Sequence, residues 1–138
     1  MILRDGKLLP GECIGEYSLG MTEESVAALL GSKYTRLDRE DGLCVISIDN
    51  ARFWFNPDNK LTQIGVTTGF VSKYKDRIGI GNTLTDIRNM IGECYREYDD
   101  YLIKGVKGIA FELSDIDSYD DEWDELTAPI EWIFIYKS

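Results

Sequence analysis

Apolar residues at helical spacing occur at two places along the chain, and each set is bounded by residues that start and end helices. The first set is Val26, Leu29 and Leu30, which follow Thr22 and precede Gly31. A threonine side chain can accept a hydrogen bond from the first turn of a helix, and glycine readily takes the left-handed conformation that ends one. This pattern predicts a short helix between Thr22 and Gly31 with one apolar face.

The second set is Ile87, Met90 and Ile91, which lie between Thr83 and Gly92. An aspartate three residues after Thr83 matches the capping box, in which two residues bond each other's backbone through their side chains. We therefore expect a second short helix with Ile87, Met90 and Ile91 on its buried face and Gly92 at its end.

Strand-like patterns follow each predicted helix. Runs rich in β-branched and aromatic residues are separated by turn formers such as Asp41-Gly42 and Asp49-Asn50. These runs predict strands at residues 43–48, 51–55, 61–67, 101–104, 108–113 and 130–136, and leave 34–39 open as one more. Alternation in the last strand predicts one face made of Ile130, Trp132, Phe134 and Tyr136, and the other made of Glu131, Ile133 and Ile135.

The two helix regions also match each other when the sequence is shifted against itself by 61 positions. Leu19-Gly20-Met21-Thr22 then falls on Ile80-Gly81-Asn82-Thr83, and Tyr34 falls on Tyr95. Chance likeness between two short amphipathic helices is the alternative explanation. An internal repeat predicts an α+β fold in which two tandem helix-plus-antiparallel-meander repeats pack side by side into one curved antiparallel sheet with helices on one face.

In this interpretation residues 1–138 form a single compact unit. The first repeat covers 11–67, the second covers 77–137, and 68–76 connect them. Each repeat alone is too small to bury its sheet, so joining the two would complete a core.

Composition narrows the possible functions. The chain has 138 residues, no histidine and a formal charge of 15 − 25 = −10, with 43% hydrophobic residues. The lack of histidine excludes Ser–His–Asp and Cys–His nucleophilic sites, and an acidic chain repels nucleic-acid phosphates. The sequence contains neither a signal-peptide pattern nor an apolar run of the roughly 20 residues that span a bilayer. Its three cysteines form no CxxC pair, so we expect reduced thiols in a cytoplasmic protein. Together with the missing histidine, these features predict no cofactor, no metal and no enzymatic activity.

One motif resembles a known group of proteins. It runs from Ile14-Gly15 through Leu19-Gly20-Met21-Thr22 and Val26 to Leu29-Leu30-Gly31, and is followed by aromatic strands and Lys60-Leu61-Thr62-Gln63-Ile64. This pattern resembles the β-lactamase-inhibitory-protein-like superfamily. The resemblance implies a concave sheet that grips a partner, an architecture similar to that of immunity proteins that neutralise bacterial polymorphic or contact-dependent toxins. The absence of an export signal and of a disulfide pattern favours the cytosolic, immunity-type members, and no contact residue of the inhibitors can be carried over.

The negative charge is concentrated in the second half of the chain. Residues 1–96 contain 13 acidic and 12 basic residues, whereas residues 97–125 contain 11 acidic residues against Lys104 and Lys107, a net charge of −9. The densest part lies between two predicted strands, where the first repeat has only a five-residue turn. A long loop at such a position is usually functional or disordered.

Three interpretations of this segment remain open. It could be a solvated acidic loop, or a calcium loop, although Tyr119, Asp120 and Leu126 depart from the calcium-binding pattern. The third interpretation is protein recognition, because aromatic anchors among carboxylates suit a basic partner. The candidate partner-binding residues are Asp115, Asp117, Tyr119, Asp120, Asp121, Glu122, Trp123, Asp124 and Glu125.

The expected function is therefore inhibition by binding. The protein would be an immunity protein that neutralises a cognate bacterial toxin, a basic protein such as a nuclease, by steric and electrostatic occlusion. No binding to nucleic acid or membrane is expected, and the oligomeric state stays open. The alternative is a structural or assembly protein that docks a permanent partner or self-associates. A hydrolase that uses carboxylates alone, such as Asp120 and Glu122, is the third option. Acid–base catalysis by two carboxylates needs burial and a difference between their pKa values, and an exposed loop provides neither.

Overall fold

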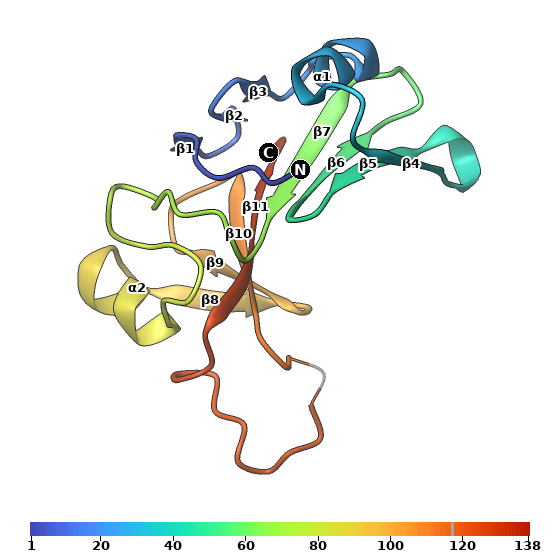
Figure 1. Cartoon of the computed structure of the whole chain (residues 1–138). Helices are drawn as coiled ribbons and strands as arrows, with labels where there is room; N and C mark the ends of the chain where they lie inside the picture. Colours follow the sequence, from blue (N-terminus) through green and yellow to red (C-terminus); the bar gives the residue numbers. More distant parts are fainter. Residues whose placement is uncertain (117) are drawn as a thin grey trace.

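A large antiparallel sheet carries most of the chain. The computed structural model describes residues 1–116 and 118–138. The eight strands of the large sheet are, in spatial order, β4 (Thr35–Asp38), β5 (Cys44–Ile48), β6 (Ala51–Phe55), β7 (Leu61–Val66), β11 (Ile130–Tyr136), β10 (Ile109–Leu113), β9 (Asp100–Ile103) and β8 (Cys94–Glu97). The other elements are α1 (Glu23–Leu30), α2 (Leu84–Met90), a short 3₁₀ turn (Glu40–Gly42) and a small sheet of β1 (Leu8–Leu9), β2 (Cys13–Ile14) and β3 (Tyr17–Ser18). The predicted α+β class is confirmed (Figure 1).

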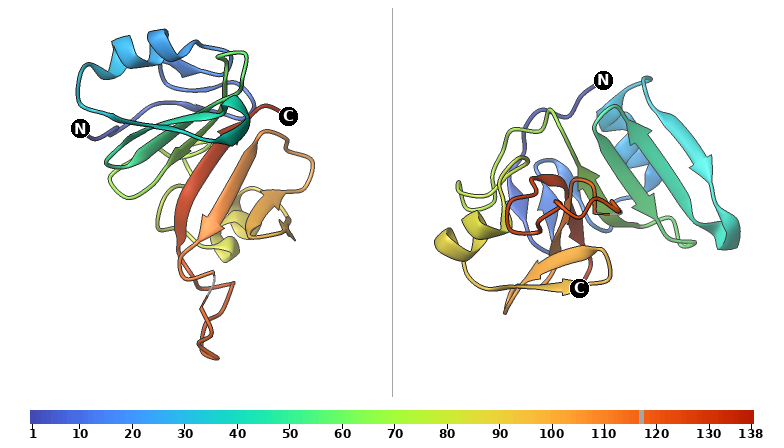
Figure 2. Two further views of the ribbon diagram at one scale, coloured as in Figure 1. Left: turned by 90° about the vertical axis from the view of Figure 1, so that its right-hand side faces the viewer. Right: turned by 90° about the horizontal axis from the view of Figure 1, so that it is seen from below.

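The strand order of the large sheet runs inward from both outer edges, so that the last strand of each half lies at the centre. Strands β4 to β7, here called the first half, follow one another inward from one edge, and strands β8 to β11, the second half, do the same from the other edge. The halves join where β7 pairs antiparallel with β11, for example Ile64 opposite Ile135. The sheet twists, so that the two halves lie at an angle to each other (Figure 2). Within the open alternative at 34–39, residues 35–38 form a strand, whereas β1, β2, β3 and β8 were not predicted.

Both helices begin with the predicted caps. The Thr22 hydroxyl accepts a hydrogen bond from the Ser25 N–H at 3.2 Å. Thr83 accepts from the Asp86 N–H at 3.2 Å, and the Asp86 carboxylate accepts from the Thr83 N–H at 3.0 Å. The capping box of α2 is thus confirmed. Within the described residues, neither α1 nor α2 is long enough to cross a membrane.

The helix ends and apolar faces depart from prediction in three places. Gly31 is the C-cap of α1 with φ 77°, as predicted, but the C-cap of α2 is Ile91, and Gly92 is not among the residues with positive φ. Leu29 and Met90, which were expected on the buried faces, are 39% and 37% exposed. Each helix is only about two turns long and contacts the core along a narrow stripe, so the third apolar position lies at its margin.

The turn before each helix is bonded to the first residue of the last strand in the same half. Gly20 and Gly81, which occupy these turns, share a φ of 94°. Four backbone hydrogen bonds of 2.7–2.9 Å make the links: Gly20 N–H to Leu61 O, Leu61 N–H to Met21 O, Gly81 N–H to Ile130 O and Ile130 N–H to Asn82 O. These bonds fix each helix against its half of the sheet.

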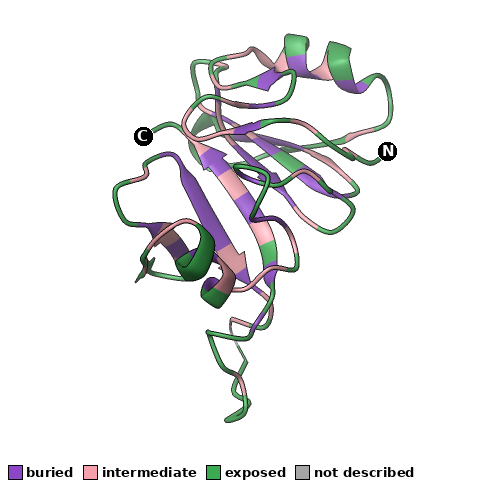
Figure 3. Cartoon of the chain, turned by 90° about the vertical axis from the view of Figure 1, so that its left-hand side faces the viewer, coloured by how far each residue is buried: buried purple, intermediate pink, exposed green. Residues whose placement is uncertain are grey.

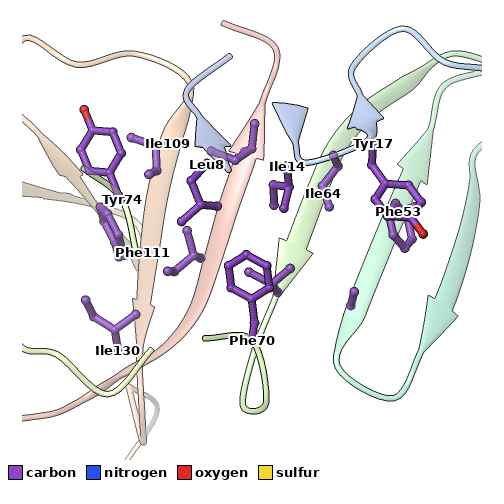
Figure 4. Packing of buried hydrophobic residues seen from close by; sticks show 14 of the residues in the cluster. Leu8, Ile14, Tyr17, Phe53, Ile64, Phe70, Tyr74, Ile109, Phe111 and Ile130 are labelled. Carbon is purple, nitrogen blue, oxygen red and sulfur yellow. The ribbon is translucent and has the colours of Figure 1, made fainter. Parts of the chain in front are cut away.

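The core lies on one face of the large sheet. The helices, the small sheet and the connection after β7 all contribute to it, through residues such as Val26, Ile87, Ile14 and Phe70. Figure 4 shows this packing at close range, and Figure 3 shows that the helices turn exposed surfaces outward. Because all these elements gather on one side, the other face of the sheet is left as surface.

A bulge corrects the predicted faces of the last strand. Leu113 pairs with Ile130 while its neighbour Glu112 pairs with Trp132, so β11 has one extra residue at this point. Ile130 therefore lies on the core side with Ile133 and Ile135, and not with Trp132 as predicted.

Candidate partner-binding surfaces

Two surfaces stand out from the rest of the molecule. The first, here called the acidic loop, is residues 114–129, which connect β10 to β11 and project from the end of the sheet (Figure 1). The second, here called the open face, is the face of the large sheet opposite the helices. The two meet at a shallow hollow lined by residues of both, including Glu112, Asp115 and Ser118.

The acidic loop presents most of the predicted site residues to solvent. Tyr119 is fully exposed, with a relative exposure of 101%. Exposed carboxylates flank it in the sequence: Asp115, Asp120, Asp121, Glu122, Asp124 and Glu125. Asp117 lies outside the described residues. Their role in binding stays a prediction.

Part of the loop is fixed to the body of the protein. The half-buried Trp123 packs against the core, and its indole N–H donates to the Ser114 carbonyl at 2.9 Å. The Tyr101 hydroxyl donates to the Glu125 carboxylate at 2.7 Å. Burial, followed by this hydrogen bond, raises the pKa of Tyr101 to about 12. Trp123 and Glu125 therefore hold the loop in place, which leaves Tyr119 as its free aromatic side chain among the described residues.

Turns within the loop use some of its carboxylates. Asp120 accepts a hydrogen bond from the Glu122 N–H at 3.0 Å, and Asp124 accepts from the Leu126 N–H at 2.9 Å. Such turns are typical of aspartate in irregular segments. In the part of the chain that the structure describes, no three His, Cys, Asp or Glu side chains are grouped so as to hold a metal ion.

The open face carries a row of aromatic side chains across the joint between the two halves. Trp54 lies edge-on to Phe134, with ring centroids 6.0 Å apart. Phe134 in turn stacks on Trp132, with centroids 5.9 Å apart and the planes within 5° of parallel. The Arg52 guanidinium lies 4.9 Å from the Trp132 ring, within the range of a cation–π interaction. All three rings are half-buried, so they remain accessible to a partner.

A glycine makes room for this row. A Cβ atom at Gly65 would lie 2.8 Å from Cε1 of Phe134 and 3.2 Å from Cζ3 of Trp54. Real side chains do not tolerate the first distance, so a larger residue would push Phe134 off the sheet. Gly65 therefore lets a ring from the second half lie flat on a strand of the first.

Next to the row is a hollow of about 260 Å³. It is lined by the Phe134 and Tyr136 rings, by Leu102 and Tyr98, and by the carboxylates of Glu97 and Asp100. Burial raises the pKa of Asp100, and the charges of Asp99 and Glu97 raise it further. Burial also raises the pKa of Tyr136, with the nearby carboxylates as a smaller cause. The hollow thus combines apolar walls with acidic groups.

Tyr98 at the edge of this hollow has an unusual backbone. It lies in the two-residue turn between β8 and β9, with φ 57°, and its side chain is 91% exposed. A bulky side chain is rarely found at this left-handed φ. Arg96 supports the turn: its Nε–H donates to the Tyr98 carbonyl at 2.7 Å, and its guanidinium lies 3.5 Å from Asp99.

The three cysteines are free thiols. Burial is the largest cause of a raised pKa in Cys13, Cys44 and Cys94. A raised pKa keeps a thiol protonated at neutral pH and so less reactive.

The sequence pointed to the residues of the acidic loop, whereas a partner-binding sheet was implied only by the resemblance and the hollow beside Phe134 was not expected. Glu97, Asp99 and Asp100 were counted in the acidic segment, yet nothing in their spacing placed them beside Phe134. Residues 94–103 show little apolar alternation, so no clear pattern in the sequence revealed the β8–β9 hairpin.

Comparisons with known proteins give information on the fold alone. No protein family matches the sequence, and no curated protein matches it either. Among solved structures, the chain is similar to the crystal structure of the uncharacterized protein yfeY from Escherichia coli, with a TM-score of 0.59 and 13% identity over 98% of this chain and 100% of that one. At this level of identity the likeness shows a shared fold alone.

Proposed function

We propose that this protein is an inhibitory protein-binding module, an immunity protein that neutralises a cognate bacterial toxin by occluding it. The proposal rests on one observation: an aromatic sheet face that lies opposite the helices adjoins a loop rich in exposed carboxylates. Half-buried rings supply contact area that is released from water on binding, and clustered carboxylates select a basic partner.

Inhibition would be steric and electrostatic, with no covalent step. The acidic loop would attract the partner, because a local concentration of one charge raises association rates by a factor on the order of 10 to 1,000 at low salt. The open face would then supply the contact area. A nuclease fits this description, since its phosphate-binding groove is basic and an acidic loop can occupy it.

The fold-level part of the proposal is that the two halves are tandem repeats of one unit packed side by side. Support comes from the mirrored strand order and from the matching hydrogen bonds of Gly20 and Gly81. A repeat of this kind agrees with the resemblance to the β-lactamase-inhibitory-protein-like superfamily. We place the protein in the cytoplasm, where its three thiols would stay reduced.

Affinity capture with three matched baits tests the proposal. The first bait is the wild type. The second neutralises the exposed loop acids but keeps the anchoring residues, as Asp115→Asn, Asp120→Asn, Asp121→Asn, Glu122→Gln and Asp124→Asn. The third removes the same number of charges from the first part of the chain, as Glu12→Gln, Glu16→Gln, Glu40→Gln, Asp41→Asn and Asp58→Asn. Asparagine can still accept the turn hydrogen bonds of Asp120 and Asp124, so the loop should keep its shape.

We expect one basic protein from the host lysate on the first and third baits and much less of it on the second. Expression of that protein should be toxic to cells, and co-expression of the wild type should relieve the toxicity. A captured protein that is not toxic, or toxicity that the wild type does not relieve, would contradict the immunity function. Equal capture by all three baits would remove the acidic loop from the interface.

A structural or assembly role is the alternative, and exposed apolar residues on the edge strands favour it. Leu37 on β4 is 61% exposed and Tyr95 on β8 is 47% exposed. In this case the open face would be covered permanently by a second copy or by a fixed partner. Light scattering after size-exclusion chromatography distinguishes the two: a stable oligomer that persists at micromolar concentration favours assembly, and a monomer favours the immunity protein.

A further inference from the structure

We propose that the hollow on the open face is a pocket for an arginine side chain carried by the basic partner. This inference rests on the proposed function, because it names the chemistry by which the same protein partner is held. The pocket is formed at the β8–β9 hairpin and at β10, β11 and β7, and so belongs mainly to the second half of the sheet.

The walls of the hollow suit the flat, weakly hydrated guanidinium group. The rings of Tyr98, Phe134 and Tyr136 line it together with Leu102, and its volume is about 260 Å³. Aromatic faces attract a guanidinium through cation–π and stacking interactions, and apolar walls cover the aliphatic stem. Arginine suits such a site better than lysine, whose ammonium is compact and strongly hydrated.

Charge complementarity comes from Glu97 and Asp100. Both carboxylates line the hollow, whose described lining contains no lysine or arginine. Asp100 sits where burial and the charges of Asp99 and Glu97 disfavour its ionised form. A partner's guanidinium would remove this penalty and could bond a carboxylate through two parallel hydrogen bonds.

Two arginines of the protein itself are engaged elsewhere. Arg96 lies over the Tyr101 ring at 5.8 Å and pairs with Asp99, and Arg52 lies over Trp132. Neither residue lines the hollow. The acidic pocket is therefore left for a cation from outside, and its two carboxylates are too few for a metal site in the described part of the chain.

Solution NMR of the ¹⁵N-labelled protein tests this inference without the partner. The probes are N-acetyl-arginine methylamide, the corresponding citrulline compound, which has the same shape without the charge, and the lysine compound. We expect saturable shifts for the arginine probe at the amides of residues 97–102 and 134–136, weaker shifts for lysine and none for citrulline.

Two matched double variants locate the binding. Glu97→Gln with Asp100→Asn should weaken arginine binding at least tenfold, whereas Glu12→Gln with Glu16→Gln should leave it unchanged. Thermal unfolding confirms that both variants are folded. Equal shifts with arginine and citrulline, or shifts that survive in the pocket variant or are largest in the acidic loop, would overturn the inference.

Failure of the pocket and failure of the proposed function give different results. If the arginine probe does not bind but the toxin is captured and neutralised, the pocket is wrong and the function stands. If the probe binds at residues 97–102 but no captured protein is neutralised, the pocket stands and the immunity function is wrong.

Discussion

The connections between the last two strands of each half differ more than any other pair of corresponding segments. In the first half, residues 56–60 make a tight turn, in which the Asn56 side chain accepts hydrogen bonds from the N–H groups of Asp58 and Lys60, both at 3.0 Å. In the second half the acidic loop fills the same place with residues 114–129.

Both connections nevertheless hold the start of their helix. Asn59 accepts a hydrogen bond from the Glu23 N–H at 3.0 Å, and the Thr85 hydroxyl donates to the Leu126 carbonyl at 3.0 Å. A short turn is therefore enough for the architecture. The extra length of the second connection presents a cluster of exposed carboxylates, and this difference supports the proposal that the acidic loop binds a partner.

The strand turns at the outer edges show a second difference of the same kind. Asp41, between β4 and β5, has φ 64°, and Tyr98, between β8 and β9, has φ 57°. Aspartate adopts this conformation much more readily than tyrosine. The first half thus has a residue that suits the backbone of its turn, Asp41. The second half has one that suits it poorly, Tyr98, at the edge of the pocket. Strain of this kind is often found at functional sites.

The largest expected effect comes from breaking the joint between the halves. Gly65→Val should lower the free energy of unfolding by about 1–3 kcal/mol, because the new side chain overlaps Phe134 and Trp54. Urea unfolding followed by tryptophan fluorescence measures this change. Gly92→Ala is the matched control, since the nearest atom to its Cβ would be 4.0 Å away. Equal losses in the two variants would mean that the halves do not depend on this contact.

Removing the helix caps should affect the two halves unequally. Thr83→Ala should cost about 1–2 kcal/mol of unfolding free energy and Thr22→Ala about 0.5–1 kcal/mol, the range measured for such caps. The difference is expected because Thr83 belongs to a reciprocal pair with Asp86, whereas Thr22 caps through its side chain alone. Chemical denaturation of both variants measures it, and a larger loss at Thr22 would contradict this ranking.

Relieving the strained turn should stabilise the fold while weakening the pocket. Tyr98→Gly should raise the free energy of unfolding by up to about 1 kcal/mol, since glycine adopts positive φ without steric cost but loses more entropy on folding. Asp41→Gly, its counterpart at the other edge, should change stability little. Thermal unfolding and arginine-probe titration of both variants check this. A loss of stability in Tyr98→Gly would show that the conformation of Tyr98 serves folding. Unchanged probe binding would show that the Tyr98 ring is not needed for the pocket.

The smallest effect is a pH dependence at Asp100. Its raised pKa means that the folded state binds the proton more tightly than the unfolded state, so Asp100 makes the fold less stable as pH rises through its unfolded and folded pKa values. Asp100→Asn should therefore stabilise the protein at pH 7 by about 0.5 kcal/mol or less, the scale of most surface changes, and lose that advantage near pH 3. Unfolding curves at both pH values measure the difference. A gain that is the same at pH 3 would point to a cause other than ionisation.

Local signals in the sequence predicted the helices, the capping box, six of the strands and the α+β class. They did not predict β8, because most residues of this edge strand are exposed and show little apolar alternation. The bulge at Ile130 depends on the pairing of β10 with β11, which no local pattern specifies. The exposed loop residues could be picked out by composition alone.

The pocket could not be predicted for a related reason. Its residues come from β7, the β8–β9 hairpin, β10 and β11, which meet only through the strand order. Gln63 and Tyr136 are far apart in the sequence yet directly opposite in the sheet. Even with every strand assigned, the pairing of β7 with β11 would still have been needed to bring Phe134 over Gly65.

The inward order of the strands also determines how the protein meets other copies of itself. Each half leaves its earliest strand, β4 or β8, at an outer edge, where unpaired backbone groups can recruit a strand from a neighbour. Both edge strands carry charges of both signs: Arg36 and Asp38 on β4, and Arg96 and Glu97 on β8. An added strand would have to desolvate these charges, which opposes edge-to-edge aggregation. The same arrangement that brings the halves together at the centre thus leaves two charged outer edges, which oppose the addition of a strand from a second copy.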